Sequence, residues 1–216
     1  MSDHEAKIFI VDDDQAVRDS LQWLIESVGM SVQSYSSGAQ FLECGFLDAV
    51  GCAILDIRMP GMSGIEVFEE MKLRESDMPV IFLTGHGDVH LAVRAMKIGA
   101  YDFLEKPFND QSLLDLIQKA IRTGRTQRKE SLHVSEINEK LENLSARERE
   151  VLDGVVGGNS NRIIADLLDL SEKTVEFHRA KMMEKMAAAT LADLIRMITH
   201  VSRAGKADIA GANALQ

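Results

Sequence analysis

The chain has 216 residues, of which 45% are hydrophobic and 27% charged, a composition typical of globular proteins and long enough for two small domains. No apolar run approaches the ~18 residues of a membrane span, and the acidic N-terminus lacks the basic-then-apolar order of a secretory signal, so we expect a cytoplasmic protein with no membrane partner. Two cysteines, Cys44 and Cys52, are too few for a disulfide framework or a zinc site.

Charge is unevenly distributed along the chain. The net charge is −10, and the segment up to Arg122 carries 20 acidic and 10 basic residues, whereas the remainder carries 14 of each. An acidic part joined to a neutral part indicates two domains with different roles. Neither part has the basic balance of a nonspecific nucleic-acid binder.

The first part alternates short apolar runs with amphipathic stretches. The runs are KIFIV, SVQSY, CAILDI, PVIFLTG and AYDFLEK, and the stretches between and after them have apolar residues at helical spacing. Five such units predict an α/β domain over residues 1–122, with a doubly wound parallel sheet. In such sheets, ligands lie beyond the carboxyl ends of the strands.

Polar residues gather at those predicted strand ends. They are Asp12, Asp13, Asp14, Asp56, Thr84 and Lys106. Taken alone, the aspartate triplet is more typical of a helix N-cap, and a strand-end aspartate is usually a turn residue. Together they indicate a single site, because clustered carboxylates need a cation and Mg²⁺ is commonly held by one or two carboxylates. A carboxylate can also attack phosphorus and form an aspartyl phosphate.

The second part begins with a polar segment, 123–143, which we expect to be a partly helical linker. A compact helical unit follows over residues 144–203, and the tail, 204–216, is rich in small residues and is expected to be disordered. Within the unit, NRIIADLLDLS predicts a short helix and a tight turn before a helix that starts after Ser171. This order predicts a helix-turn-helix, although the neutral charge alone would favour a plain helical bundle.

The helix after Ser171 has two distinct faces. Val175, His178, Met182 and Met186 fall within a narrow arc that should face inward. The outer arc includes Phe177, an exposed apolar residue that could contact thymine methyl groups.

The motifs of the first part, VDDD, LDIRMPGMSG, LTGHGD and EKPF, resemble the receiver domain of bacterial two-component response regulators. The resemblance implies a (βα)5, flavodoxin-like fold in which Asp56 accepts a phosphoryl group from a sensor histidine kinase. It implies Mg²⁺ or Mn²⁺ held by Asp12, Asp13, Asp56 and the backbone carbonyl of Arg58. Thr84 and Lys106 take the switch and phosphate-pairing positions, and Phe103 takes the switch aromatic position. His86 and His90 then belong to a loop signature and a helix start, not to a metal site.

The block from LSARERE to TVEFHRAKMMEKM resembles the LuxR-type four-helix output domain of NarL/FixJ regulators. It implies a non-enzymatic transcription factor that binds double-stranded promoter DNA as a phosphorylation-dependent homodimer, with RNA polymerase as a further partner. The implied DNA-contacting residues are Lys173, Thr174, Glu176, Phe177, Arg179 and Lys181. The implied dimer face consists of Leu191, Leu194, Ile195 and Ile198. Glu176 could accept from a cytosine amino group or pair with Lys173 or Lys181.

An enzyme is the competing interpretation. Asp12 and Asp14 resemble the paired aspartates of haloacid-dehalogenase phosphatases, with Asp12 as the nucleophile. That hypothesis leaves Asp56 and the helix-turn-helix without a role.

Overall fold

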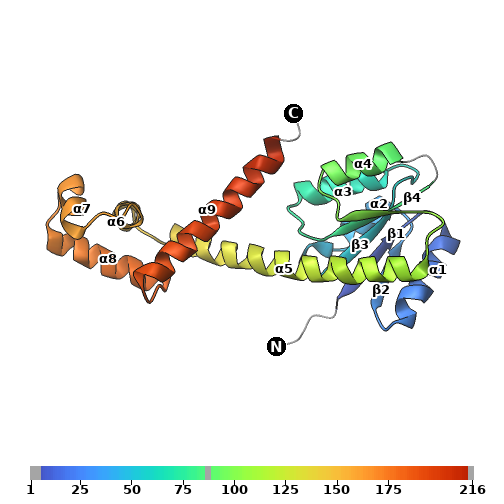
Figure 1. The fold of residues 1–216 in the computed structure, drawn as a ribbon, viewed down its shortest axis with the longest axis horizontal. Helices are drawn as coiled ribbons and strands as arrows, with labels where there is room; N and C mark the ends of the chain where they lie inside the picture. The colour runs from blue at the N-terminus through green and yellow to red at the C-terminus, as the bar shows by residue number, and fades with distance from the viewer. Residues whose placement is uncertain (1–5, 86–88, 214–216) are drawn as a thin grey trace. The chain divides into compact units, whose positions relative to one another are not determined.

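The computed structural model describes residues 6–85 and 89–213, without the side chains of Asp48, Val89 and residues 203–213 (Figure 1). The chain divides into two compact units, Met1–Lys129 and Glu130–Gln216. His86 lies outside the described residues, so its expected place in a loop has no structural counterpart here.

The first unit is built on five parallel strands in the order β2-β1-β3-β4-β5. The strands are β1 (Lys7–Val11), β2 (Ser31–Tyr35), β3 (Gly51–Asp56), β4 (Val80–Thr84) and β5 (Asp102–Glu105). The helices are α1 (Gln15–Ser27), α2 (Gly38–Glu43), the 3-10 helix η1 (Phe46–Asp48), α3 (Gly64–Leu73), α4 (Val89–Lys97) and α5 (Asp110–Glu142). This is the predicted (βα)5 doubly wound fold.

Helices cover both faces of the sheet, which is why β3 and β4 are continuous buried apolar runs. Alternate strand residues pack to opposite sides: Phe9 and Leu55 contact the layer of α2, α3 and α4, whereas Ile10 and Ile54 contact α1 and α5. In register, Val11 pairs with Leu55, so β1 and β3 end together. The carboxyl ends of the strands therefore form one edge.

The segment 123–143, expected to be a partly helical linker, is helical as far as Glu142 and belongs to α5. This helix runs without interruption from Asp110 to Glu142, and the boundary between the units falls inside it, after Lys129. Ile137 is buried in the core of the second unit, and Leu141 packs against that core. The part of α5 after Lys129 therefore belongs to the second unit, which the sparse apolar residues of the segment did not indicate.

The second unit adds α6 (Ala146–Val156), α7 (Asn161–Leu168), α8 (Glu172–Met186) and α9 (Leu191–Asn213). Ser145, Ser160 and Ser171 cap the first three of these helices through their hydroxyl groups. Asp169 ends α7 in the left-handed region, with φ of 53°, and produces the tight turn into α8. The helix-turn-helix prediction thus has a structural counterpart in α7 and α8.

The C-terminal tail, 204–216, was expected to be disordered, and the structure describes only its backbone as far as Asn213. The α9 helix continues to Asn213, and residues 214–216 lie outside the described part. None of the helices in the described ranges combines the length and apolar character that spanning a membrane requires.

Candidate functional site

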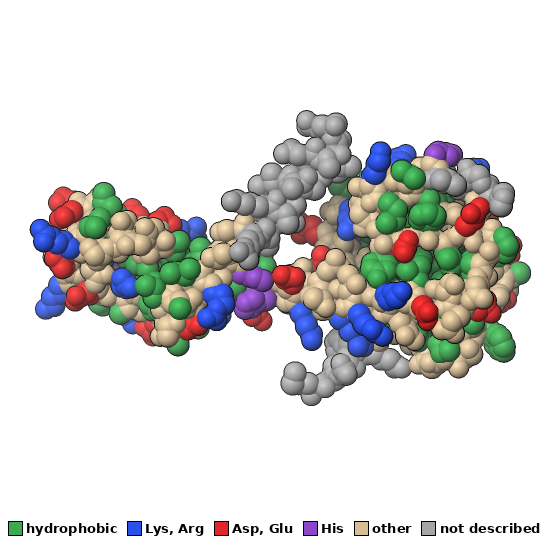
Figure 2. Space-filling view, viewed as in Figure 1, with side chains coloured by type: hydrophobic (Ala, Val, Ile, Leu, Met, Phe, Trp, Pro, Cys, Tyr) green, Lys and Arg blue, Asp and Glu red, His purple; other side chains and the backbone are tan. Residues whose placement is uncertain are grey.

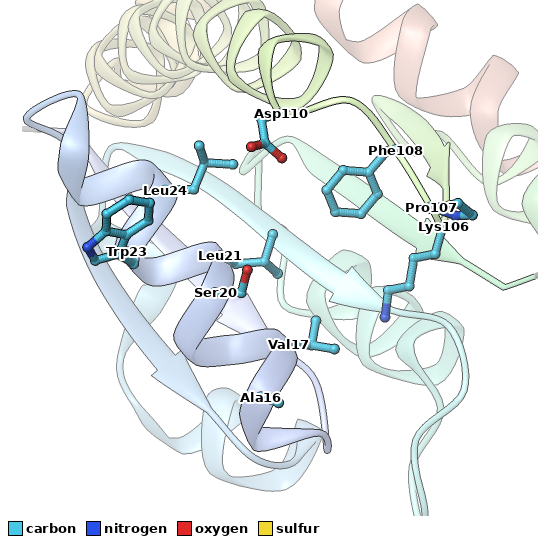
Figure 3. A pocket seen from close by; sticks show the side chains of 10 residues that line it. All are labelled: Ala16, Val17, Ser20, Leu21, Trp23, Leu24, Lys106, Pro107, Phe108 and Asp110. Atoms are coloured by element: carbon cyan, nitrogen blue, oxygen red, sulfur yellow. The ribbon is translucent and has the colours of Figure 1, made fainter.

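Lys106 joins two carboxylates at the carboxyl edge of the sheet. Its Nζ donates to Asp12 Oδ2 at 2.8 Å and to Asp56 Oδ1 at 2.6 Å. Asp12 and Asp56 are buried, and the Lys106 side chain is 28% exposed. Figure 3 shows the Lys106 side chain extending away from Pro107 toward the first turn of α1. The structure therefore brings together residues that are 94 and 50 positions apart in the sequence.

Backbone groups fix the two carboxylates. Asp12 Oδ1 accepts from the N–H of Asp14 at 2.9 Å, and Asp56 Oδ2 accepts from the N–H of Arg58 at 2.7 Å. Asp14 caps α1 by accepting from the N–H of Ala16, so the helix-cap interpretation is correct for this one member of the triplet. Each buried carboxylate thus has both oxygens engaged, which limits the cost of burial.

Sequence reasoning missed Arg18 in this region. Its guanidinium donates to the backbone carbonyls of Asp12 at 2.8 Å and Asp13 at 3.0 Å, and so braces the loop after β1. The signal was present, because Arg18 follows the triplet by one helical turn and its chain is long enough to reach back.

The charges at the site are not balanced. Burial raises the pKa of Asp56 and the nearby Asp12 charge adds to this, although Lys106 and the N–H of Arg58 oppose it. Burial would lower the pKa of Lys106, but the hydrogen bonds and charges of Asp12 and Asp56 outweigh it and raise that pKa. Lys106 therefore remains an ammonium at neutral pH and faces two carboxylates, which leaves room for a further cation.

Thr84 and Phe103 lie on neighbouring strands but in different environments. Thr84 is buried at the end of β4, and its carbonyl accepts from the N–H of Lys106 at 2.8 Å. Phe103 lies opposite Phe82 in the register of β4 and β5, yet 37% of it is exposed. The aromatic side chain thus lies on the surface in this state rather than in the core.

The donor set suits Mg²⁺ without forming a complete cage. Among residues 6–85 and 89–213, no three or more His, Cys, Asp or Glu side chains are gathered as a metal site. Asp12 and Asp56 supply two carboxylates, and Asp13 is exposed beside them. Because Mg²⁺ keeps several waters and commonly uses one or two carboxylates, these residues fit the ion.

A groove of roughly 450 Å³ lies beside Lys106. Figure 3 shows that its lining comes from α1 on one side and from Lys106, Pro107 and Phe108 on the other. Trp23, the single tryptophan of the chain, lines it and is 76% exposed.

The outward face of α8 presents some of the predicted DNA-contacting residues and engages others. Lys173, Glu176 and Phe177 are exposed, and Thr174 is half-buried, with its hydroxyl 2.7 Å from that of Ser171. On the face of the second unit seen in Figure 2, acidic and basic side chains are interspersed.

Two predicted cationic contacts already have partners within the domain. Arg179 donates to Asn161 Oδ1 at 3.0 Å and so links α8 to α7, and Lys181 pairs with Glu184 at 2.8 Å. The Lys181 pair is exposed and therefore weak. The alternative in which Glu176 pairs with Lys181 is not realised, because Lys181 pairs with Glu184.

On the inward face of α8, Val175, Met182 and Met186 are fully buried, as their spacing predicted. His178 is only half-buried, and its ring lies beside that of Phe177 with centroids 5.6 Å apart.

The predicted dimer face on α9 is corrected in part. Leu194 is fully buried and Ile198 packs against the same core, so both serve their own domain. Leu191 and Ile195 are about 40% exposed. The four residues were grouped on one apolar stripe, but α9 needs part of that stripe to attach to the domain.

An ion pair between the buried Glu148 and the exposed Lys185 in the second unit was also missed. Glu148 completes a capping box with Ser145 and accepts from Lys185 Nζ at 2.6 Å, while Lys185 also donates to the carbonyl of Asn143 at 3.2 Å. The hydrogen bond from Lys185, followed by that from the backbone of Ser145, lowers the pKa of Glu148 to about 2. The Ser-x-x-Glu spacing was a signal for the cap, but nothing local identified Lys185.

Comparison with known proteins matches a different family to each of two successive parts of the chain. Residues 8–118 match the response regulator receiver domain, and residues 142–198 match the bacterial regulatory proteins of the luxR family. The transcriptional regulatory protein FixJ of Bradyrhizobium diazoefficiens is 44% identical over 190 residues, which cover 88% of this chain and 93% of that protein. The response regulator protein TodT of Pseudomonas putida is 44% identical over 197 residues, covering 91% and 87%.

Solved structures of response regulators are similar to this chain over most of its length. Full-length FixJ from B. japonicum is 42% identical with a TM-score of 0.57, over 92% of this chain and 98% of that one. The response regulator StyR is 37% identical with a TM-score of 0.79, over 90% and 98%. The chain therefore belongs to the two-component response regulators that join a receiver domain to a LuxR-type DNA-binding domain and regulate transcription.

Proposed function

We propose that Asp56 accepts a phosphoryl group from a sensor histidine kinase and that the resulting aspartyl phosphate promotes dimerisation and promoter binding. The observation that carries this proposal is the Lys106 ammonium, which lies 2.6 Å from Asp56 Oδ1 and 2.8 Å from Asp12 Oδ2. A cation held against a strand-end carboxylate is what transfer of an anionic group to that carboxylate requires.

In the transfer step, an Asp56 carboxylate oxygen forms a bond to phosphorus while the bond between phosphorus and the donor imidazole nitrogen breaks. The donor nitrogen keeps the electron pair of the broken bond. Lys106 stabilises the negative charge on the phosphoryl oxygens, and the N–H of Arg58 orients the carboxylate. Mg²⁺ or Mn²⁺, held by Asp12, Asp13, Asp56 and the carbonyl of Arg58, would add neutralisation of the phosphoryl charge.

The switch follows from the added acceptor oxygens. In this proposal the hydroxyl of Thr84, a residue buried at the end of β4, donates to the phosphoryl group. Movement of Thr84 vacates space that the exposed Phe103 ring can enter by packing, because phenylalanine has no hydroxyl to bond. A change from 1% to 99% active needs about 5.5 kcal/mol of differential stabilisation, which several charge-assisted hydrogen bonds can largely provide.

On the output side, α8 is the proposed recognition helix. Lys173, Glu176 and Phe177 are exposed for base or phosphate contacts, and Lys181 can leave Glu184 for a phosphate. Arg179 serves mainly to position α8 through Asn161. Leu191 and Ile195 are the remaining candidates for a contact between two output domains, and RNA polymerase is the proposed further partner on the promoter.

The groove beside Lys106 is the proposed approach for the kinase. It opens next to the residues that hold Asp56, and an exposed tryptophan at its wall offers the kind of rigid aromatic anchor that dominates protein interfaces.

The test is phosphorylation of the full chain with acetyl phosphate and Mg²⁺, followed by intact mass, size-exclusion and promoter mobility-shift measurements. We expect one added phosphoryl group, absent in Asp56→Asn and retained in the matched control Asp14→Asn, which keeps a capping oxygen. Label that persists in Asp56→Asn but disappears in Asp12→Asn, together with turnover of a generic phosphate ester, would instead favour the phosphatase hypothesis.

A further inference from the structure

A second cavity, of roughly 320 Å³, lies within the second unit, Glu130–Gln216, which is called the output unit below. Its lining residues are remote in sequence from Asp12 and Asp56. His133 on α5 and His200 on α9 both line it, with ring centroids 5.3 Å apart and ring planes inclined by 59°. Figure 2 shows histidine side chains grouped on the surface of this part of the chain. Two imidazoles from different helices thus share one cavity that the phosphorylation and DNA-binding roles leave unexplained.

One of these imidazoles has an unsatisfied nitrogen. His200 Nε2 is buried and has no hydrogen-bond partner among the described residues. Buried polar atoms are nearly always paired, so such an atom indicates a ligand, an ion or an ordered water.

The other imidazole, that of His133, is 55% exposed and therefore open to a ligand. His133 Nδ1 lies 4.0 Å from Glu136 Oε2, one helical turn along α5. That distance is too long for a hydrogen bond, so Glu136 does not occupy the Nδ1 position of His133.

A methionine thioether is the third candidate donor that lines the cavity. Met197 lies three residues before His200 on α9 and lines the same cavity. Arg196 also lines it, but its guanidinium is 3.3 Å from Asp193, which offsets its charge. A thioether is a soft donor that selects Cu⁺, and imidazole binds copper among other transition metals, so this set favours Cu⁺ over hard cations such as Mg²⁺.

We propose that His133, Met197 and His200 bind a soft transition-metal cation, Cu⁺ being the ion that this donor set fits. The bound ion would join α5 to α9 within the output unit. It would therefore couple the stability of α9, which carries the exposed Leu191 and Ile195, to metal availability. This site is independent of phosphorylation at Asp56.

The test is anaerobic titration of the full chain with Cu⁺ buffered by bathocuproine disulfonate. Every variant carries Cys44→Ser, because the partly exposed Cys44 thiol is a competing soft ligand, whereas Cys52 is buried. We expect one tight site, weakened more than about tenfold by His133→Gln or His200→Gln and less by Met197→Leu. His90→Gln, on an exposed histidine of α4, is the matched control and should leave the affinity unchanged.

Two further readouts separate ligation from folding. X-ray absorption should show nitrogen and sulfur neighbours of copper, and Cu⁺ should slow hydrogen exchange in residues 191–202. Met197→Leu nearly conserves volume, so its effect reports ligation even where a histidine variant fails to fold. Either an equal Cu⁺ affinity in the His200 and His90 variants or the absence of sulfur from the copper shell would overturn the proposal. So would slower hydrogen exchange of α9 with inorganic phosphate but not with Cu⁺.

Discussion

Replacing Lys106 with methionine removes the cation that joins Asp12 and Asp56 but keeps a side chain of similar length. Breaking a buried ion pair by removing one partner costs about 3–5 kcal/mol of stability, because a buried charge is left without compensation. Here two carboxylates lose the same partner, but 28% of the Lys106 side chain is exposed and solvent screens part of the interaction. We therefore expect the receiver unit to lose about 2–3 kcal/mol of stability at neutral pH.

The pH dependence of this loss has a definite sign. The pKa of Asp56 is already raised by burial, and the loss of Lys106 removes the main effect that opposes the rise. A carboxyl group whose pKa is higher in the folded state than in the unfolded chain binds its proton more tightly when folded, so lowering the pH favours folding. The stability difference between the variant and the parent should shrink as the pH falls from neutrality through the raised pKa of Asp56.

Hydrogen exchange measured by mass spectrometry checks this prediction in the full chain, because peptides from β1 and β3 report the receiver unit and those from α8 report the output unit. A loss of 2–3 kcal/mol corresponds to about 30- to 150-fold faster exchange in β1 and β3. The matched control is Lys119→Met, an exposed lysine on α5. If Lys106→Met exchanged no faster than Lys119→Met, or if its deficit did not vary with pH, the reasoning about uncompensated carboxylates would be refuted.

Three further predictions concern an ion pair, a tightly packed glycine and the groove beside Lys106. The pKa of Glu148 is lowered to about 2, chiefly by Lys185, so this carboxylate contributes stability that is fully present above its unfolded pKa near 4.5 and is lost as the pH falls toward 2. Glu148→Gln should therefore flatten that part of an acid-unfolding curve followed by hydrogen exchange in α6 and α8. Gly124→Ala would place a Cβ 2.7 Å from Pro79 Cδ. The overpacking should outweigh the gain in helix propensity and lower the free energy of unfolding by about 1 kcal/mol. A stabilised variant would instead show that α5 can shift at this position. Trp23→Ala should slow phosphoryl transfer from the cognate kinase on the order of tenfold while labelling by acetyl phosphate stays unchanged; equal loss with both donors would place the defect in the site itself.

Several features of this protein are determined by short stretches of sequence. Strand-length apolar runs separated by amphipathic stretches determine the (βα)5 fold, since burial on both faces requires continuous apolar strands. The fold then places Asp12, Asp56, Thr84 and Lys106 at one edge, because parallel strands bring their carboxyl ends together. Serine caps, such as Ser171, similarly determine where helices of the output domain begin.

Other features depended on contacts between residues far apart in the chain, and no local pattern carries them. Whether 123–143 is a linker or part of α5 was decided by the burial of Ile137 in the output core. The periodic stripe on α9 could face a partner or its own domain, and packing assigned Leu194 to the core. Likewise, the meeting of His133 with His200 depends on how α5 and α9 pack, because side-chain periodicity shows which residues share a face but not what that face contacts.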